Sequence, residues 1–519
     1  MHSPLSAGPL LQDYVRHSAK IRPETTALVC GAERLSYAEL DRRSNALANH
    51  FVASDVKRGD RVLIFADNTV QTVIAFWAAL KANAVVSVVN PRTRSDKLRY
   101  LLHDSRPSVF VSDTALQGVF EQPVRSCGSL KRIVLSGDPG GDALLPGALR
   151  WDEALARASE EAPPRRTCID IDLAAIIYTS GSTGDPKGVM LTHRNMLAAC
   201  TSIVSYLGIR EDDVILSVLP LAFNYGLYQM IMAFSSGARL VLERSFAFPR
   251  QILRRVSEEG VSGFPGVPTM FSMLAEMKSL GPFDLSKVRY VTNTAGALTA
   301  KHIRSLREIF RGARIYSMYG LTECKRCTYL PPEDLDRKPT SVGIAIPNTE
   351  VWIVDERGER VPPGGIGQLV IRGATVMKGY WEKPEATAQT LRPGPLPGES
   401  VLYTGDYCRM DEDGYVYFVA RMDDVIKSRG EKVAPSEVET ALMNIAGVKE
   451  AAVIGVPDEA LGQAVKAFVV LESGARLAAK DLQRLCRARL ESFMVPKYIA
   501  IVPGLPRTDT GKIRKIDLS

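Results

Sequence analysis

Alternating strand-like and helix-like patterns constrain the fold of this chain most strongly. Residues 37–51 and 75–83 have apolar positions spaced as in amphipathic helices. Residues 62–65 and 84–89 are short apolar runs of the kind found in buried strands. The alternation resumes at residue 173 and continues to about residue 330. Strands that alternate with helices build largely parallel sheets covered by helices, so the sequence predicts an α/β architecture for this part of the chain.

The pattern changes after residue 341. Short strand-like runs separated by Gly/Pro turns follow, at residues 350–354, 367–371 and 414–418, and predict a small antiparallel sheet or barrel. Beyond residue 421 a short α+β pattern predicts helices at 436–444 and 480–490 and strands at 451–454 and 465–471. We therefore expect a large domain over residues 1–422, with a β-rich subdomain at 340–420, and a small mobile α+β domain over residues 423–519.

Length and composition limit the possible functions. A chain of 519 residues is too long for one ordinary core, so at least two domains are expected. The chain is 45% apolar and 24% charged, as in globular proteins, and its formal charge is +7. This charge is spread along the chain, which argues against nucleic-acid binding and is compatible with small polyanions such as nucleotides and coenzyme A. No apolar run is long enough to predict a membrane span.

The cysteines and the start of the chain indicate a reducing compartment. Eight cysteines in a chain of this length do not predict a disulfide framework. Cys324 and Cys327 form a C-x-x-C, but no second Cys or His pair stands at zinc spacing, so a structural or incidental role is expected. The first residues lack a basic region followed by an apolar core. A cytoplasmic location is therefore expected.

A loop rich in glycine and hydroxyl groups, residues 178–189, follows the apolar run at residues 173–178. Glycine lets the backbone approach an anion closely, and backbone N–H groups and hydroxyls then donate to phosphate oxygens. Lys187 adds a positive charge at the end of the loop. The glycine spacing is not that of a Walker A loop. The alternative, a flexible linker, is disfavoured because a strand-like run precedes the loop.

Four further motifs carry candidate chemistry. Thr322 can bond a phosphate oxygen, and Glu323 beside it is a candidate Mg²⁺ ligand, because a carboxylate repels phosphate unless a cation lies between them. Asp406 can accept both hydroxyls of a ribose. Residues 421–424 form a charged candidate hinge, and Lys512 is a candidate reach-in cation on the C-terminal tail. Exposed turns, an acidic linker and a solvated basic terminus are the competing interpretations of these motifs.

Together and in this order, these motifs resemble those of the adenylate-forming superfamily, which includes acyl-CoA and aryl-CoA synthetases, stand-alone adenylation domains and luciferase-like ligases. The resemblance covers nearly the whole chain and includes Gly379, Tyr380 and Trp381. It implies an ATP-dependent ligase that activates a carboxylic acid as an acyl-adenylate, releases pyrophosphate and transfers the acyl group. The implied cofactors are ATP and Mg²⁺, with CoA as co-substrate.

The resemblance also implies roles for individual residues. The phosphates of ATP would be held by Thr179, Ser180, Gly181, Ser182, Thr183, Gly184 and Lys187. The rest of the nucleotide site would comprise Ala295, Gly296, Ala297 and Tyr319 at the adenine, Asp406 and Arg421 at the ribose, Thr322 at the α-phosphate, and Gly320, Leu321 and Phe418. Glu323 would bind Mg²⁺, Asp423 would be the hinge, and Lys512 would bridge the acid and the α-phosphate. The implied catalytic set is Lys512, Glu323, Thr322 and Thr183.

The implied acid pocket comprises Phe223, Asn224, Tyr225, Gly296 and Gly320. Amino-acid-activating relatives usually carry Asp where Asn224 stands, and a buried ammonium without a counterion is costly. A free α-amino acid is therefore not expected as the substrate. The pattern around Asn224 is similar to that of aryl-acid adenylating enzymes of siderophore pathways, so an uncharged aromatic or cyclic acid is predicted, with a medium-chain fatty acid as the alternative.

The acceptor is predicted from the loop after the candidate hinge. Lys427, Arg429, Gly430 and Lys432 resemble the CoA-facing loop of CoA ligases, so CoA is the expected acceptor. Transfer to an amine or amino acid, and loading of a carrier protein, remain alternatives. A nucleotide-binding sensor without catalysis is disfavoured because Glu323, Asp406 and Lys512 are all present.

Overall fold

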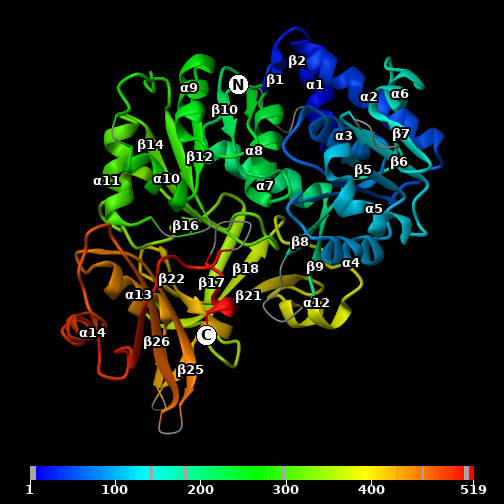
Figure 1. Cartoon of the computed structure of the whole chain (residues 1–519). Helices are drawn as coiled ribbons and strands as arrows, with labels where there is room; N and C mark the ends of the chain where they lie inside the picture. Colours follow the sequence, from blue (N-terminus) through cyan, green and yellow to red (C-terminus); the bar gives the residue numbers. More distant parts are fainter. Residues whose placement is uncertain are drawn as a thin grey trace. The chain divides into compact units, whose positions relative to one another are not determined.

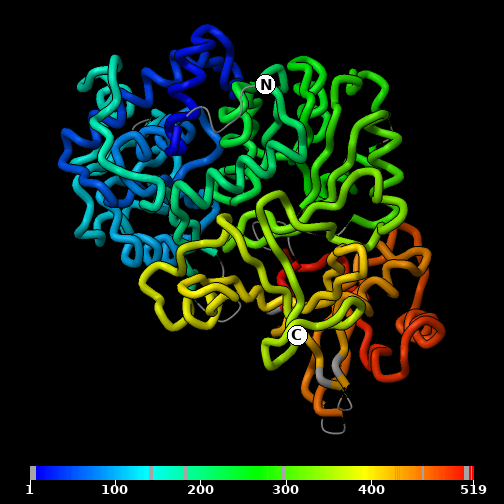
Figure 2. The backbone as a smooth tube through the Cα atoms, turned by 180° about the vertical axis from the view of Figure 1, so that it is seen from behind, coloured from blue at the N-terminus to red at the C-terminus, as the bar shows by residue number. Residues whose placement is uncertain are grey.

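The computed structural model describes residues 8–138, 144–179, 185–277, 279–294, 296, 298–428, 431–458, 461–507 and 513–518. The chain forms two compact units, and its path is shown from two sides in Figures 1 and 2. The first unit consists of Met1–Pro339, Ala345–Glu350 and Ile371–Leu402, and the second of Thr340–Ile344, Val351–Val370 and Tyr403–Ser519. The boundary predicted at residue 422 separates a large domain from a small mobile one. A division into compact units does not test which parts of the chain move, so this boundary stays a prediction.

Two large sheets form most of the first unit. In the described residues, one sheet has nine strands in the order β16 (Ile344–Ala345), β15 (Thr328–Leu330), β14 (Arg314–Tyr319), β13 (Tyr290–Asn293), β12 (Gly263–Gly266), β10 (Val214–Ser217), β11 (Arg239–Leu242), β1 (Thr26–Cys30) and β2 (Glu33–Ser36). The other has eight strands in the order β19 (Gly379–Tyr380), β9 (Lys187–Thr192), β8 (Leu173–Thr179), β4 (Val85–Val89), β3 (Arg61–Phe65), β5 (Val109–Asp113), β6 (Arg132–Ser136) and β7 (Ala148–Arg150).

The central strands of both sheets are parallel. Strands β10 to β14 pair in parallel within the first sheet, and β3 to β6 within the second. Antiparallel pairs lie toward the edges: β1 with β2, β14 with β15, and β8 with β9. The predicted α/β architecture is therefore confirmed.

Helices lie between the strands in the chain, as the alternation predicts; Figure 1 shows α9, α10 and α11 beside strands of the nine-stranded sheet. The helices of this unit are α1 (Asp13–Ile21), α2 (Tyr37–Ala53), α3 (Val70–Lys81), α4 (Ser95–Ser105), α5 (Gln117–Arg125), α6 (Trp151–Ala156), α7 (His193–Leu207), α8 (Asn224–Ser235), α9 (Pro249–Glu259), α10 (Pro268–Ala275), α11 (Ala300–Ile309) and α12 (Pro384–Thr390), with short 3₁₀ turns at η2 (Thr114–Leu116) and η3 (Pro332–Asp334).

Helix α8 is anchored in the core of the first unit. Residues Tyr225 to Phe234 of this helix are all buried. The ring of Phe234 lies 5.8 Å from that of Trp77 on α3 and 5.9 Å from that of Tyr37 on α2, measured between centroids. Each fully buried aromatic side chain contributes about 2 kcal/mol through apolar burial. The first turn of α8, which carries the predicted acid pocket, therefore stands on a rigid base.

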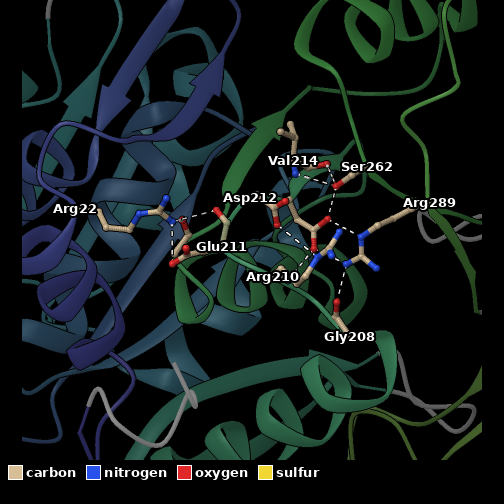
Figure 3. A network of polar contacts seen from close by, with 10 residues as sticks. Arg22, Gly208, Arg210, Glu211, Asp212, Val214, Ser262 and Arg289 are labelled. Atoms are coloured by element: carbon tan, nitrogen blue, oxygen red, sulfur yellow. Dashed lines mark hydrogen bonds and ion pairs between the residues drawn. The ribbon is translucent and has the colours of Figure 1, made fainter. Parts of the chain in front are cut away.

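An ion pair between the buried Asp213 and the half-buried Arg289 links residues that directly precede strands of the nine-stranded sheet (Figure 3). Arg289 Nε donates to Asp213 Oδ1 at 2.8 Å, and Ser262 Oγ donates to the same oxygen at 2.6 Å. Arg289 also donates to the carbonyl of Gly208, at the end of α7, at 2.7 Å. Burial raises the pKa of Asp213, but the hydrogen bonds from Arg289 and Ser262 outweigh it, so the pKa lies below its usual value.

His193, the first residue of α7, makes the first unit sensitive to acid. The backbone N–H of Leu11 donates to His193 Nδ1 at 3.3 Å, which requires a neutral ring. Burial lowers the pKa of His193 to about 4, with Asp172 and Asp170 opposing and Arg166 reinforcing the effect. The unfolded chain, with a His pKa of about 6.5, therefore binds more protons between these values.

We expect the titration of His193 to lower the free energy of unfolding by up to roughly 3 kcal/mol as the pH falls from 6.5 to 4. Urea unfolding of the wild type and of His193→Gln at pH 7 and pH 4.5 tests this. The variant should lose less stability between the two pH values, and an equal loss in both proteins would contradict the assignment.

The second unit contains the β-rich and C-terminal segments. One described five-stranded sheet has the order β17 (Thr349–Val354), β18 (Ile366–Gly373), β21 (Ser400–Met410) and β20 (Leu391–Pro393), with β22 (Val416–Arg421) also on β21; the division between the units runs through it. The other has the order β24 (Glu431–Val433), β23 (Ile426–Ser428), β26 (Gly462–Leu471) and β25 (Val448–Asp458), with β27 (Tyr498–Ile501) on β26. The remaining elements are α13 (Pro435–Met443), α14 (Ala479–Arg487), η4 (Met422–Asp424) and η5 (Lys515–Asp517).

These elements confirm the predicted fold of the second half of the chain. For the β-rich segment the sequence predicts an antiparallel sheet or a barrel, and the structure shows a sheet with the antiparallel pairs β20–β21 and β21–β22. The C-terminal α+β core joins α13 and α14 to one face of β25 and β26. In the described part of the chain, no helix is both long and apolar enough to span a membrane.

Candidate functional site

The predicted phosphate loop connects two paired strands. Thr179 ends β8 and Lys187 begins β9, and the two residues are partners across the antiparallel pair. A Cβ at Gly188 would lie 2.7 Å from a methyl group of Ile176, so only glycine fits there. The other predicted loop residues, Ser180, Gly181, Ser182, Thr183 and Gly184, lie outside the described residues.

Tyr380 brings the end of this loop together with the Thr-Glu motif. Its Oη donates to Glu323 Oε1 at 2.8 Å, and Lys187 Nζ lies 5.3 Å from the centroid of its ring. Strand β19, which carries Tyr380, pairs with β9 directly after Lys187. The backbone N–H of Met377 also donates to the carbonyl of Glu323 at 2.7 Å. The structure therefore places a lysine near the ring and a carboxylate at the hydroxyl of one buried tyrosine.

The segment after β14 folds back tightly on itself. The N–H of Cys327 donates to the carbonyl of Tyr319 at 3.0 Å. A Cβ at Gly320 would lie 2.3 Å from the carbonyl oxygen of Lys325, so this turn requires glycine. Leu321 and Thr322, between these points, are half-buried.

Two buried cations follow Glu323, and sequence reasoning missed both. Lys325 is 1% exposed, and burial lowers the pKa of its ammonium to about 7, with Cys324 and Glu323 opposing the shift. Arg326 is 3% exposed, and its guanidinium carbon lies 4.7 Å from the centroid of the Tyr225 ring. The adjacent Lys-Arg pair was visible in the sequence, but its burial was not, because adjacent charges are usually solvated.

Three of the five residues of the predicted acid pocket lie at the start of α8. Phe223 is the N-cap residue, and Asn224 follows it. Tyr225 Oη donates to the carbonyl of Thr292 on β13 at 2.8 Å. The backbone of Gly296, further along that connection, accepts a hydrogen bond of 2.8 Å from Asn293 Nδ2. Ala295 and Ala297 lie outside the described residues.

In the second unit the two predicted ribose residues meet. Asp406 on β21 pairs with Arg421 on β22, and Asp406 Oδ1 lies 3.4 Å from Arg421 Nε. Asp406 is 2% exposed, whereas Phe418 on the same sheet is 37% exposed. Asp423 is exposed on η4. A buried carboxylate beside a guanidinium suits the hydroxyl donors of a sugar.

The remaining predicted residues of the second unit belong to the CoA loop and the tail. The backbones of Lys427 on β23 and Lys432 on β24 stand opposite each other in an antiparallel pair. Arg429, Gly430 and Lys512 lie outside the described residues. Their roles stay predictions.

Glu323 has the chemistry of a magnesium ligand. Mg²⁺ in nucleotide sites is usually held by one or two carboxylates together with phosphate oxygens and water. Glu323 offers one carboxylate, oriented by Tyr380. No group of three or more His, Cys, Asp or Glu side chains that could hold a metal occurs among the described residues, so a cage made by protein alone is not seen there. The residues present therefore fit Mg²⁺ brought with a nucleotide.

Sequence comparison decides the family. The family described as AMP-binding enzyme matches residues 15–381, and the family described as AMP-binding enzyme C-terminal domain matches residues 437–512. The chain belongs to the AMP-binding enzymes, the adenylate-forming superfamily. The resemblance inferred from the motifs is confirmed.

Relatives of this enzyme act on carboxylic acids and CoA. The chain is 34% identical over 499 residues to a feruloyl-CoA synthase of Amycolatopsis sp., covering 96% of both chains. It is similar in structure to ATP-bound MatB from Rhodopseudomonas palustris, with a TM-score of 0.88, 29% identity and 98% of both chains covered. It is also similar to the anthranilate CoA ligase AuaEII in complex with anthranoyl-AMP, with a TM-score of 0.89 and 26% identity. This match covers 100% of the present chain and 98% of AuaEII. The predicted class, an ATP-dependent AMP-forming acid–thiol ligase, is confirmed by this kinship.

Tyr380 belongs to a motif of the resemblance, but sequence reasoning assigned it no role, whereas its hydrogen bond to Glu323 predicts that it positions this carboxylate. A hydrogen bond to a charged group contributes about 1.5–3 kcal/mol. We expect Tyr380→Phe to lower kcat/KM for acid-dependent exchange of pyrophosphate into ATP by about 10- to 100-fold. The matched control is Tyr417→Phe, which removes a hydroxyl bonded to Asp411 Oδ2 at 2.9 Å. Equal activity of the two variants would rule out the positioning role.

Proposed function

We propose that the enzyme joins an aromatic, cyclic or other non-amino carboxylic acid to CoA. The observation that carries this proposal is the polar but uncharged start of α8. Nδ2 and Oδ1 of Asn224 are both buried and have no hydrogen-bond partner among the described residues. An amide suits a hydroxyl or carbonyl of the substrate, whereas an α-ammonium would need a buried carboxylate. The names of the relatives that act on ferulate and anthranilate support an aromatic acid.

In this proposal the phosphates, the adenine and the ribose of the nucleotide are each assigned to named residues. The polyphosphate is bound by Thr179, residues 180–184 and Lys187, and the α-phosphate by Thr322. The adenine lies along Ala295, Gly296, Ala297, Tyr319, Gly320 and Leu321, and the ribose is held by Asp406 and Arg421, with Phe418 beside the nucleotide. Lys187 at the edge of β9 and the Asp406–Arg421 pair support these roles.

The first half-reaction forms the acyl-adenylate. A carboxylate oxygen of the acid attacks the α-phosphorus, a new P–O bond forms, and the bond to pyrophosphate breaks. Groups preorganised to neutralise the charge that develops there lower the barrier. Lys512 supplies one such charge in this proposal, while Tyr380 holds the Glu323 carboxylate in place. Mg²⁺, when bound at Glu323, would neutralise charge on the phosphate oxygens.

The second half-reaction transfers the acyl group. The small C-terminal domain turns about Asp423, which withdraws Lys512 and admits the acceptor. The CoA thiol loses its proton, its sulfur attacks the acyl carbon, and AMP leaves. Lys427, Arg429, Gly430 and Lys432 serve the CoA side. We also propose a cytoplasmic location, supported by the eight cysteines, for none of which a disulfide is seen in the described residues.

The test is acid-dependent exchange of labelled pyrophosphate into ATP. Benzoic, cinnamic, cyclohexanecarboxylic and fatty acids are supplied together with the standard amino acids. Exchange with non-amino acids is expected, and exchange with amino acids alone would overturn the substrate class. The absence of exchange with every acid would favour a nucleotide sensor. CoA, a carrier protein or an amine is then added to the adenylate, and mass spectrometry of the product identifies the acceptor, CoA being expected.

A further inference from the structure

The two basic side chains after Glu323 are buried, and each has a nitrogen without a hydrogen-bond partner among the described residues. Lys325 is 1% and Arg326 is 3% exposed. No hydrogen-bond partner is present there for Lys325 Nζ or for Arg326 Nε. Removing a charge from water is costly unless an opposite charge and hydrogen bonds replace the water. This position therefore suits an anion that the protein itself does not supply.

Arg326 lies against the predicted acid pocket. Its guanidinium carbon is 4.7 Å from the centroid of the Tyr225 ring, and one of its N–H groups donates to the carbonyl of Lys325 at 3.2 Å. A ring face compensates only part of the cost of a buried cation. Tyr225 directly follows Asn224, whose amide atoms are also buried without a partner. The Nε of Arg326 and the amide of Asn224, which have no hydrogen-bond partner among the described residues, are thus both associated with the first turn of α8.

Gly320, another residue of the predicted acid pocket, packs against the same two residues. A Cβ at Gly320 would lie 2.3 Å from the carbonyl oxygen of Lys325 and 2.8 Å from Cα of Arg326. The turn at Gly320 therefore fixes the backbone from which the Arg326 side chain extends. The guanidinium itself contacts the Lys325 carbonyl and the Tyr225 ring, so it is positioned before any ligand binds, which favours selective recognition.

We propose that Arg326, assisted by Asn224, binds a second carboxylate of the acid substrate, so that the enzyme prefers dicarboxylic acids. The inference rests on the proposed function and adds to it the charge of the substrate. A planar guanidinium matches a carboxylate through paired hydrogen bonds. The carboxylate that is activated must stay free for the α-phosphorus, so the group at Arg326 is a different one. This differs from the uncharged acid that the sequence predicts, because that expectation considered Asn224 without Arg326.

Matched pairs of acids test the preference. The wild type is assayed by pyrophosphate exchange with benzoate against isophthalate and with hexanoate against adipate. We expect kcat/KM to be higher for at least one diacid than for its monoacid partner. A monoacid preference in both pairs would overturn the inference without any variant. Exchange with the monoacids would still support the proposed function, so the two failures are distinguishable.

Arg326→Met removes the charge and keeps most of the length of the side chain. We expect kcat/KM to fall by about 10²-fold for the preferred diacid, to hold or rise for its monoacid, and KM for ATP to stay unchanged. Arg326→Lys should restore part of the diacid activity. The control is Arg314→Met, which removes an exposed guanidinium 5.3 Å from the Tyr316 ring and should leave the ratio unchanged. Equal losses for both acids with a raised KM for ATP would assign Arg326 to the nucleotide, and an unchanged ratio would exclude recognition of the second carboxylate.

Discussion

Replacing Glu323 with glutamine is expected to lower kcat/KM for pyrophosphate exchange by about 10²–10³. Glutamine keeps the shape of the side chain and an oxygen that can accept a hydrogen bond from the Tyr380 hydroxyl. In the wild type this hydroxyl lies 2.8 Å from Glu323 Oε1. Only the negative charge is lost. If Glu323 holds Mg²⁺ beside the phosphates, the variant should also need a higher Mg²⁺ concentration for half-maximal exchange.

The measurement is a titration of exchange activity with Mg²⁺ at saturating ATP and acid. Glu333→Gln is the matched control, because this glutamate of the same unit is 68% exposed and pairs only with Arg314, at 3.7 Å, among the ion pairs of the described residues. A Glu323→Gln enzyme with the Mg²⁺ dependence of the wild type would remove Glu323 from the metal site. Activity within about twofold of the wild type would remove it from the catalytic machinery altogether.

Local sequence patterns predicted the elements of this fold well where one pattern dominated. The helix expected at 37–51 is α2 (Tyr37–Ala53), and the strand expected at 62–65 is β3. Helix α3 was predicted to begin at residue 75 but begins at Val70, after the N-cap Thr69. Every residue of α3 except Gln71 is buried, so the helix has no polar face whose periodicity could mark its start.

The motifs predicted which site residues lie next to each other only where the two residues belong to strands that are adjacent in the sequence. Asp406 and Arg421 meet because a hairpin joins β21 to β22. The contact of Tyr380 with Glu323 links residues 57 positions apart, and no pattern within either motif specifies it. The guanidinium of Arg326 lies over the Tyr225 ring of α8, a contact that a one-dimensional pattern does not contain. The acid pocket was therefore the part of the site that the sequence described least completely.

Removing the carboxylate of Asp213 is expected to destabilise the first unit by about 3 kcal/mol. Asp213 is 3% exposed and binds Arg289, Ser262 and the backbone N–H of Arg210 at 2.7 Å. Asp213→Ala would leave the Arg289 guanidinium half-buried without its anion and would break the links between β10, β12 and β13. Because the folded pKa of Asp213 is lowered, its stabilisation is present above the unfolded pKa of about 3.9 and is lost as the pH falls through the folded pKa. The effect should therefore be complete at pH 7.

Urea unfolding at pH 7, followed by tryptophan fluorescence, measures this loss. Asp212→Ala is the matched control, since the neighbouring carboxylate is 72% exposed and lies 3.5 Å from Arg210 in a solvated pair. Its expected cost is below about 1 kcal/mol. In the double variant Asp213→Ala/Arg289→Ala, the loss should be smaller than the sum of the two single losses, because the second substitution removes the cation that the first leaves unpaired. Additive losses, or equal losses for Asp212→Ala and Asp213→Ala, would show that the pair does not stabilise the sheet as a unit.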